Sequence, residues 1–440
     1  MGKPGVALCN RDFENDAHST ASSRGMPGIR IVPETIPLEC IVPEQIEPGV
    51  NAAMDSIITA LTRPLTSEED TPSVKVETPS RIAFKGNLEE INRFFYKRGW
   101  TDGLPIIPPT EEAVAEMLTG TDLPTDHVVA KLIPRLGKAT VEKIAINAVM
   151  AGALPVHLPV LIAGLRALLR PEVRLTAWEV STGGFAPFWI INGPIRHDLR
   201  VNGGQGILNP GDLANAAIGR AMGLIIKNIG GARKGIEDMA TLGNPGKYSM
   251  AIAENEEENP WEPLHVQHGF NKEDSTVTVS FISSYYQVLR YGTDDKGVMR
   301  ALVYNLMPAL GGLFWFILTP SSAEFLVRAG WTKKEITDFI SEYSRVPLYR
   351  TPMYYGQAAD ITERPEPRGR LPVLNGEDYV SPTANWPGRM NIVVAGGAGS
   401  VVGVARGGRH DAATERIELP ANWAKLVDKY RDVVPTYIRY

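Results

Sequence analysis

The sequence predicts an α/β protein in which an incomplete small parallel α/β segment precedes a large mixed α/β body. Three observations predict this class. Strand-like and helix-like runs alternate over residues 1–65, an acidic stretch rich in Ser, Thr and Pro covers residues 66–85, and short buried runs separated by Gly and Pro fill residues 86–440. Alternating strands and helices are typical of parallel pairing, and a polar stretch that is poor in apolar residues is typical of a linker.

The first segment reads as strand, helix, strand, helix. Residues 5–8 and 29–32 are short apolar runs, and residues 12–23 and 45–62 have helical patterns. We expect the two strands to pair in parallel through a right-handed crossover. Because two strands are too few for a stable sheet, either part of this layer is missing on its N-terminal side or its edge docks on another sheet.

Composition excludes several classes of protein. With 45 basic and 50 acidic residues the net charge is −5, which argues against a nucleic-acid protein held by bulk basicity. The two cysteines, Cys9 and Cys40, cannot form a disulfide framework or a four-thiolate zinc site, so we expect a reducing, cytoplasmic location. The most apolar stretch, Ile144 to Leu169, is interrupted by prolines and predicts two buried helices, so we expect no membrane partner.

The large body opens with a proline-rich segment at residues 99–110. Its prolines fix an extended backbone, and Thr110 is placed to cap a helix that begins at Glu111. Thr101 and Asp102 either line a binding site or serve the turn.

A glycine-rich loop at residues 201–211 follows a buried strand at 188–191 and precedes a helix at about 212–227, for which Asn209 is the expected N-cap and Pro210 the first residue. Such a loop exposes N–H groups at the positive end of the helix dipole, which predicts a site for a small anion. Alternatively, the glycines only permit close packing. The expected ligand-binding side chains are amides and two arginines able to hold a carboxylate: Asn192, Asn202, Asn209, Asn215, Arg196 and Arg220.

Candidate catalytic residues lie between residues 243 and 268. A carboxylate beside buried apolar residues can act as an acid or a base, and Lys247 or Tyr248 could hold an oxyanion. The alternative is a solvated acidic surface. His265 and His268 have the spacing of two metal ligands, but no further ligand motif accompanies them and we expect no metal. The expected catalytic set is Lys247, Tyr248, Glu254, Glu256 and His265.

Two further features lie near the C-terminus. Residues 391–395 predict a buried strand that runs into a glycine-rich turn at 396–400, which is either a second anion site or a close packing contact. Residues 423–432 predict a helix that docks on the body.

Residues 3–62 and 94–270 resemble the UGSC family of (seleno)proteins, which is named for a selenocysteine- or cysteine-Gly-Ser-Cys motif. The segments that carry the resemblance are residues 99–110, 147–152, 191–195, 209–220 and 246–265. Relatives carry cysteines where Ala153 and Ala251 stand here, and the namesake motif is absent from this chain. Given the resemblance, we expect that a selenocysteine lies upstream of the present start, that a separate small subunit carries the Sec/Cys motif, or that this protein has lost the redox chemistry.

Three functions follow as expectations. The resemblance implies a redox enzyme, or a component of one, that cleaves a bond reductively in a small anionic substrate with a thiol or selenol. The residues also allow a non-redox lyase or hydrolase that acts on a small carboxylate, with Glu254 or Glu256 as the base. The third is a non-catalytic binding subunit. We expect a homo-oligomer and, apart from a possible selenocysteine, no cofactor.

Overall fold

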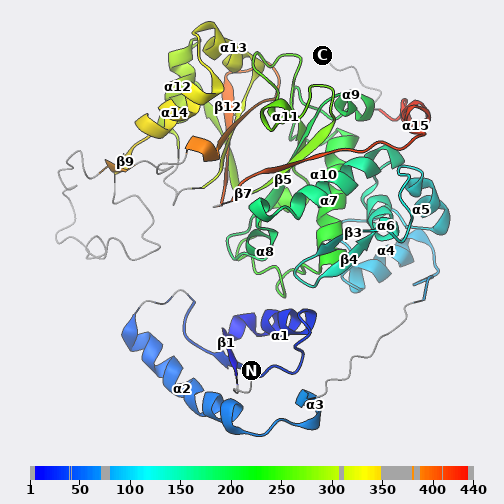
Figure 1. Cartoon of the computed structure of the whole chain (residues 1–440), viewed down its shortest axis with the longest axis vertical. Coiled ribbons are helices and arrows are strands. Elements are labelled where there is room, and N and C mark those ends of the chain that lie inside the picture. Colours follow the sequence, from blue (N-terminus) through cyan, green and yellow to red (C-terminus); the bar gives the residue numbers. More distant parts are fainter. Residues whose placement is uncertain are drawn as a thin grey trace.

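The computed structural model describes residues 5–38, 40, 42–70, 80–306, 312–347, 379–380, 387–408 and 410–434. It contains a small α/β unit at the N-terminal end, blue in Figure 1, and a large body that runs from cyan to red. Helices surround a large mixed sheet in the body, which confirms the α/β class.

The small unit has the expected order of elements. Its parts are β1 (Ala7–Asn10), α1 (Glu14–Ser23), β2 (Ile31–Glu34) and α2 (Pro43–Thr62). The two strands are parallel, with Ala7 opposite Ile31, and each begins two residues later than expected. A short helix, α3 (Ser67–Asp70), lies inside the stretch expected to be a linker, where Glu69 pairs with Arg30 at 3.0 Å. Residues 71–79 of that stretch lie outside the described residues.

Helix α1 connects the small unit to the body by two hydrogen bonds. The Ser19 hydroxyl donates to Glu237 Oε1 at 2.5 Å, and the Ser23 hydroxyl donates to the carbonyl of Pro134 at 3.2 Å. The small unit therefore has a defined contact surface on the body.

The body is built on one seven-stranded sheet with the order β11-β8-β12-β7-β5-β6, and β13 also pairs with β7. The pairs β5–β6 and β8–β11 are parallel, and the other pairs are antiparallel. The strands are β5 (Ala186–Asn192), β6 (Ala251–Ala253), β7 (Thr276–Leu289), β8 (Phe314–Leu318), β11 (Met390–Val394), β12 (Val401–Gly407) and β13 (Ala413–Arg416).

Three hydrophobic cores cover the two faces of this sheet. In the first core, Trp189 and Ile191 of β5 pack with α6 (Val141–Ala151), α7 (Leu158–Leu168) and α10 (Leu213–Ile225). In the second core, alternate residues of β8 pack with α12 (Asp295–Tyr304), α13 (Pro320–Arg328) and α14 (Lys333–Tyr343). Figure 1 shows these two groups of helices over different ends of the sheet.

The third core shows that the sheet curls. Phe188 of β5 meets Trp315 of β8 edge to face, with ring centroids 5.9 Å apart, although these strands are not neighbours in the sheet. Ile190 and Ile317 join them in this core. Because side chains alternate along a strand, β5 and β8 each send one set of residues to the helices and the other set into the curl.

Shorter elements complete the body. The predicted apolar stretch forms α6 and α7, separated by a 3-10 turn (Pro155–His157), and no helix in the described ranges is long and apolar enough to cross a bilayer. Helix α15 docks as expected, because the Trp423 indole N–H donates to Asp198 at 2.8 Å. The remaining elements are α4 (Leu88–Lys97), α5 (Glu111–Leu118), β3 (Val128–Leu132), β4 (Gly137–Thr140), α8 (Leu175–Trp178), α9 (Ile195–Leu199), α11 (Leu264–Gln267), β9 (Val346–Pro347), β10 (Tyr379–Val380) and α15 (Trp423–Tyr430).

Candidate functional site

Strand β5 delivers Asn192 to the edge of the sheet, where the chain turns sharply. Gly193 has φ +84°, and a Cβ atom there would lie 2.1 Å from the carbonyl oxygen of Asp274, so a side chain cannot be accommodated. This turn aims the Gly193 N–H at Glu256 Oε1, 2.7 Å away. The backbone therefore fixes one donor of the site.

Strand β6 runs parallel to β5 and ends beside it, which brings Glu254 into the same region. The Glu254 side chain is fully buried and accepts hydrogen bonds from Asn192 Nδ2 at 2.6 Å, Asn259 Nδ2 at 2.8 Å and the Leu264 N–H at 2.7 Å. Burial raises the pKa of Glu254, and the ammonium of Lys333, 3.9 Å away, opposes that shift in part.

Glu256 lies against Glu254 because both carboxylates share one amide. Asn192 Nδ2 donates to Glu256 Oε1 at 3.0 Å as well as to Glu254. The same Oε1 lies 3.0 Å from Arg196 Nε and 3.9 Å from His265 Nδ1. These five residues form the carboxylate cluster: Asn192, Arg196, Glu254, Glu256 and His265.

The guanidinium of Arg196 is held entirely by the protein. It donates to the Gly193 carbonyl at 3.0 Å, to the Glu254 carbonyl at 2.9 Å and to both oxygens of Glu257 at 2.9 and 3.1 Å. Arg196 thereby lowers the pKa of Glu257 to about 2. The carboxylate that Arg196 was expected to bind in a substrate is here supplied by the chain itself.

Three buried polar atoms around the cluster have no hydrogen-bond partner among the described residues. They are Asn192 Oδ1, His265 Nδ1 and Thr276 Oγ1, and all three side chains are fully buried. Thr276 lies directly opposite Asn192 in the β5–β7 pair. Since an unpaired buried polar atom costs roughly 1–3 kcal/mol, several of them in one place indicate a site that binds something polar.

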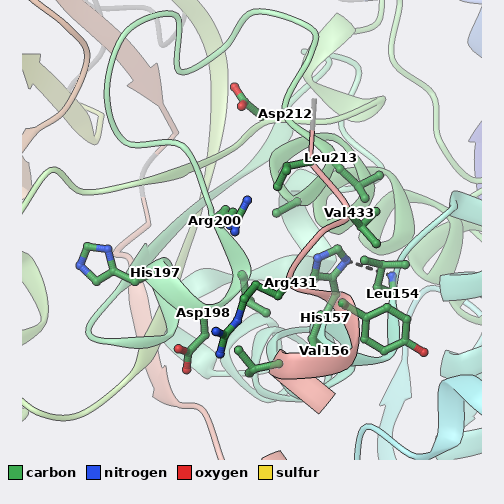
Figure 2. Close-up of a pocket in the computed structure, with 15 residues that line it drawn as sticks. Leu154, Val156, His157, His197, Asp198, Arg200, Asp212, Leu213, Arg431 and Val433 are labelled. Atoms are coloured by element: carbon green, nitrogen blue, oxygen red, sulfur yellow. Dashed lines mark hydrogen bonds between the residues drawn. The ribbon is translucent and has the colours of Figure 1, made fainter. Parts of the chain in front are cut away.

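A cavity of about 240 Å³ lies next to helix α9 (Figure 2), the helix that also carries Arg196 of the cluster. The residues that line the cavity come from the 3-10 turn before α7, helix α9, the first turn of α10 and the chain between residues 427 and 434. His197 lines the cavity, and its Nε2 lies 2.9 Å from Oε1 of Glu257, the carboxylate that Arg196 holds. Helix α9 therefore connects the cavity to the carboxylate cluster.

The amide side chains that were expected to bind a ligand instead form hydrogen bonds that hold the glycine-rich loop in place. Asn215 Oδ1 accepts the Asn202 N–H at 2.8 Å, and Asn215 Nδ2 donates to the carbonyls of Asn202 and Ala251 at 3.0 Å. Asn202 Nδ2 donates to the Gln205 carbonyl at 3.0 Å and to Asp212 at 2.8 Å.

The expected N-cap of α10 was wrong, although the helix begins at Leu213, close to the expected residue 212. Its N-cap is Asp212, whereas Asn209 closes a turn through its N–H to the Gly206 carbonyl at 2.7 Å. Gly211 has φ +135°, which no helix accommodates, so Pro210 cannot be the first helical residue. The expected stop is confirmed, since Gly231 in the left-handed region follows a π-helical turn (Ile226–Gly230).

Lys247 and Tyr248 lie away from the cluster. They precede β6 while Glu254 follows it, so the strand separates them. Lys247 Nζ contacts Asp238 at 2.5 Å and lies 3.9 Å from Glu179 Oε1, and Tyr248 is exposed. Burial raises the pKa of Glu179 to about 8. The lysine thus belongs to a second buried ionic group.

A third group of polar contacts is formed by Arg220, Asp102 and Thr101. Arg220 makes a bidentate pair with Asp102 at 2.8 and 3.0 Å, and the Thr101 hydroxyl accepts the Gly103 N–H at 3.1 Å. These contacts hold the proline-rich segment on α10, and Thr110 caps α5 as expected.

Several residues of the site escaped prediction. His157 lies between two prolines, which was the one local hint that its position is rigid, and Arg200 has φ +54°, which sequence does not reveal. Lys333 reaches Glu254 from far along the chain, as Arg431 reaches the cavity. No sequence spacing signals such long-range neighbours.

The described residues contain no group of three or more His, Cys, Asp or Glu placed to hold a metal ion. His268 points its Nδ1 at Thr414 Oγ1, 2.6 Å away, and not at His265. Both cysteines are free thiols in the small unit; burial and the carboxylates of Glu14, Glu34 and Asp16 raise the pKa of Cys9.

Comparisons of the chain with family models, with curated proteins and with solved structures found no match. The resemblance to the UGSC family therefore stays a prediction from the sequence. The geometry of the carboxylate cluster and its cavity is the basis for a functional proposal.

Proposed function

We propose that the chain is an enzyme that transfers protons on a small anionic substrate, as a lyase or hydrolase, at the carboxylate cluster. One observation supports this most: two buried carboxylates share a single amide in a place where three buried polar atoms have no partner. Buried charged and polar groups in proteins are usually paired, so unpaired polar atoms beside two buried carboxylates support a functional site.

Glu256 is the proposed general base. The Asn192 amide and the Gly193 N–H donate to its Oε1 and Arg196 forms an ion pair with the same oxygen, which fixes the orientation of the carboxylate, whereas Oε2 has no hydrogen bond among the described residues. A base held in this way is prepared to accept a proton without reorganising. Glu254 acts through the shared amide of Asn192 and is a positioning residue.

His265 is the proposed partner of Glu256 in proton transfer. Its Nε2 lies 3.3 Å from the carbonyl of Lys272, which favours a proton on Nε2 in the neutral ring. Its Nδ1 then carries a lone pair that faces Glu256 Oε1 at 3.9 Å. A proton that the Glu256 carboxylate takes from the substrate can pass to this lone pair, and the imidazolium formed can then return it as the acid.

The redox function implied by the family resemblance has less support from the geometry. A raised pKa keeps the Cys9 thiol protonated near neutral pH, and the thiolate is the reactive form. Cys9 also lies in β1 of the small unit and not at the carboxylate cluster. The thiol or selenol reaction remains a proposal that rests on the resemblance alone.

Exchange of Glu256 tests the proposed function. We expect the chain to turn over a member of a panel of small carboxylates, esters and amides followed by proton NMR in D2O, and Glu256→Gln to lower that rate about 10²–10⁴-fold. Glu258→Gln is the matched control, because Glu258 belongs to the same acidic run but is exposed and contacts only Asn255 among the described residues.

Two results would contradict the proposal. Equal turnover by Glu256→Gln and the unaltered chain would show that the carboxylate is structural. Equal losses in Glu256→Gln and Glu258→Gln would show that the acidic run acts through its overall charge and not through the buried pair.

A further inference from the structure

The cavity next to α9 has hydrogen-bond donors that have no partner among the described residues. Its floor is His157, which is 2% exposed. His157 Nδ1 accepts the N–H of Leu154 at 3.1 Å, so the proton of the neutral ring must sit on Nε2. In Figure 2, Arg200 and Arg431 lie on the opposite side of this ring from Leu154.

Nε2 of His157 is therefore a donor without a partner among the described residues. Burial lowers the pKa of His157 to about 4, so the ring is neutral at physiological pH and keeps this single Nε2–H. Because the ring is neutral, His157 can donate this hydrogen bond to an anion without first taking up a proton.

The first turn of α10 supplies further donors to the same cavity. Its N-cap, Asp212, makes no side-chain hydrogen bond to the helix. Leu213 and Ala214 line the cavity, and their N–H groups have no partner in the part of the chain that the structure describes. The positive end of a 13-residue helix thus opens into the cavity.

Two arginines complete the lining. Arg200, at the end of α9, has no partner among the described residues, and Arg431, after α15, makes only an exposed pair with Asp428 at 3.3 Å. The acidic groups of the lining are already engaged, since Asp198 accepts from Trp423 at 2.8 Å and Asp212 accepts from Asn202 at 2.8 Å.

We infer that this cavity binds a small oxyanion, and that the oxyanion is the anionic group of the substrate. The donors are the His157 Nε2–H, the first N–H groups of α10, and the guanidinium groups of Arg200 and Arg431. The volume of about 240 Å³ suits a carboxylate or phosphate with few other atoms and is below the usual range for larger ligands. The substrate assignment rests on the proposed function, whereas the binding does not.

Binding of malonate and of inorganic phosphate to the full chain, measured by titration calorimetry at constant ionic strength, tests the inference. We expect at least one of them to bind with a millimolar or lower Kd. The double variant Arg200→Gln/Arg431→Gln should weaken that binding at least tenfold, because charge-assisted hydrogen bonds are lost. Arg300→Gln is the matched control, since Arg300 is an exposed arginine of α12 outside the cavity lining.

The outcomes separate the possible ligands and the two proposals. Binding of malonate alone indicates a carboxylate ligand, and binding of phosphate alone indicates a phosphate ester. No binding of either probe at 20 mM, or unchanged binding in the double variant, overturns the site. Glu256→Gln should bind the probe with a Kd within twofold of that of the unaltered chain. A result against Glu256 as the base would therefore not contradict the anion site. Unchanged turnover in the double variant overturns the substrate assignment alone.

Discussion

Glu179 shows at the scale of one residue how burial sets a protonation state. Its side chain is 7% exposed, its Oε2 has no partner among the described residues, and burial raises its pKa to about 8. The Coulombic attraction of Lys247 opposes this shift, but desolvation is the larger effect. Glu179 is therefore largely protonated near neutral pH in the folded protein.

The stability of the protein should fall between mildly acidic and mildly alkaline pH because of Glu179. A group whose pKa is raised on folding stabilises the fold fully below its unfolded pKa, near 4.5, and loses that contribution as the pH rises through about 8. We expect Glu179→Gln to lose less stability between pH 5 and pH 8 than the unaltered chain in urea unfolding. Glu172→Gln, an exposed carboxylate nearby in sequence, is the control. Parallel pH curves for all three proteins would contradict the assignment.

Part of the site was predictable at this scale. Asn192 was expected at the end of a buried strand, and Glu254 and Glu256 in an acidic run beside apolar residues, but their meeting at one edge of the sheet depends on the pairing of β5 with β6. Lys247 was grouped with Glu254 and Glu256, but it lies at the other end of β6, a three-residue strand that the sequence did not reveal. The pairing of Arg220 with Asp102 spans 118 positions, and no local pattern reveals such a contact.

At the scale of the element, one glycine positions the cluster. Gly193 and Gly235 both have positive φ, +84° and +72°, but they differ in the space around them. A Cβ atom on Gly193 would lie 2.1 Å from a carbonyl oxygen, whereas one on Gly235 meets nothing within 4 Å. Alanine at Gly235 therefore introduces backbone strain alone, whereas alanine at Gly193 introduces backbone strain and a steric conflict.

Alanine at Gly193 should be far more costly than alanine at Gly235. We expect Gly235→Ala to cost about 1–2 kcal/mol of unfolding free energy, from the left-handed backbone alone. Gly193→Ala should cost about 2–4 kcal/mol more, because the strand end must shift away from Asp274. Urea unfolding measures both. Similar losses for the two variants would show that the turn after β5 is not tightly packed.

Element boundaries were predictable where local chemistry decides them. The N-cap Thr110, the left-handed stop at Gly231 and the proline break between α6 and α7 all follow from neighbouring residues. The N-cap of α10 was wrong, although its start was close, because the conformation of Gly211 depends on its surroundings and Asp212 competes with Asn209 as the cap. Short strands such as β6 also escaped, since a three-residue run has no measurable period.

At the scale of the whole molecule, the small unit has its own two-stranded sheet and meets the body through α1. Sheets of two strands are marginal alone. The contact with the body is therefore part of what keeps α1 folded.

Removing the Ser19 hydroxyl should loosen α1 on the body. Its hydrogen bond to the buried carboxylate of Glu237 is worth about 1 kcal/mol, so we expect amide hydrogen exchange in α1 to quicken about fivefold in Ser19→Ala. Ser22→Ala is the control, because Ser22 is exposed on the same helix. Equal exchange rates in the two variants would show that this bond does not couple the unit to the body.

The α/β class was predictable from alternating elements, but the curl of the sheet was not. The curl depends on the pairing of β7 with β5 at one end and with β12 at the other. These partners are separated by long stretches of chain, and the sequence of β7 shows only a strand pattern in which apolar residues alternate with Thr and Ser.

Strand β7 also determines how the body comes apart. It gives Val277, Val279 and Phe281 to the first core, Ile282 to the third and Val288 to the second. Loss of packing in any one core therefore destabilises β7, on which the packing of the other two cores depends. The body should denature in a single all-or-none step, and no fragment that ends within β7 should fold alone.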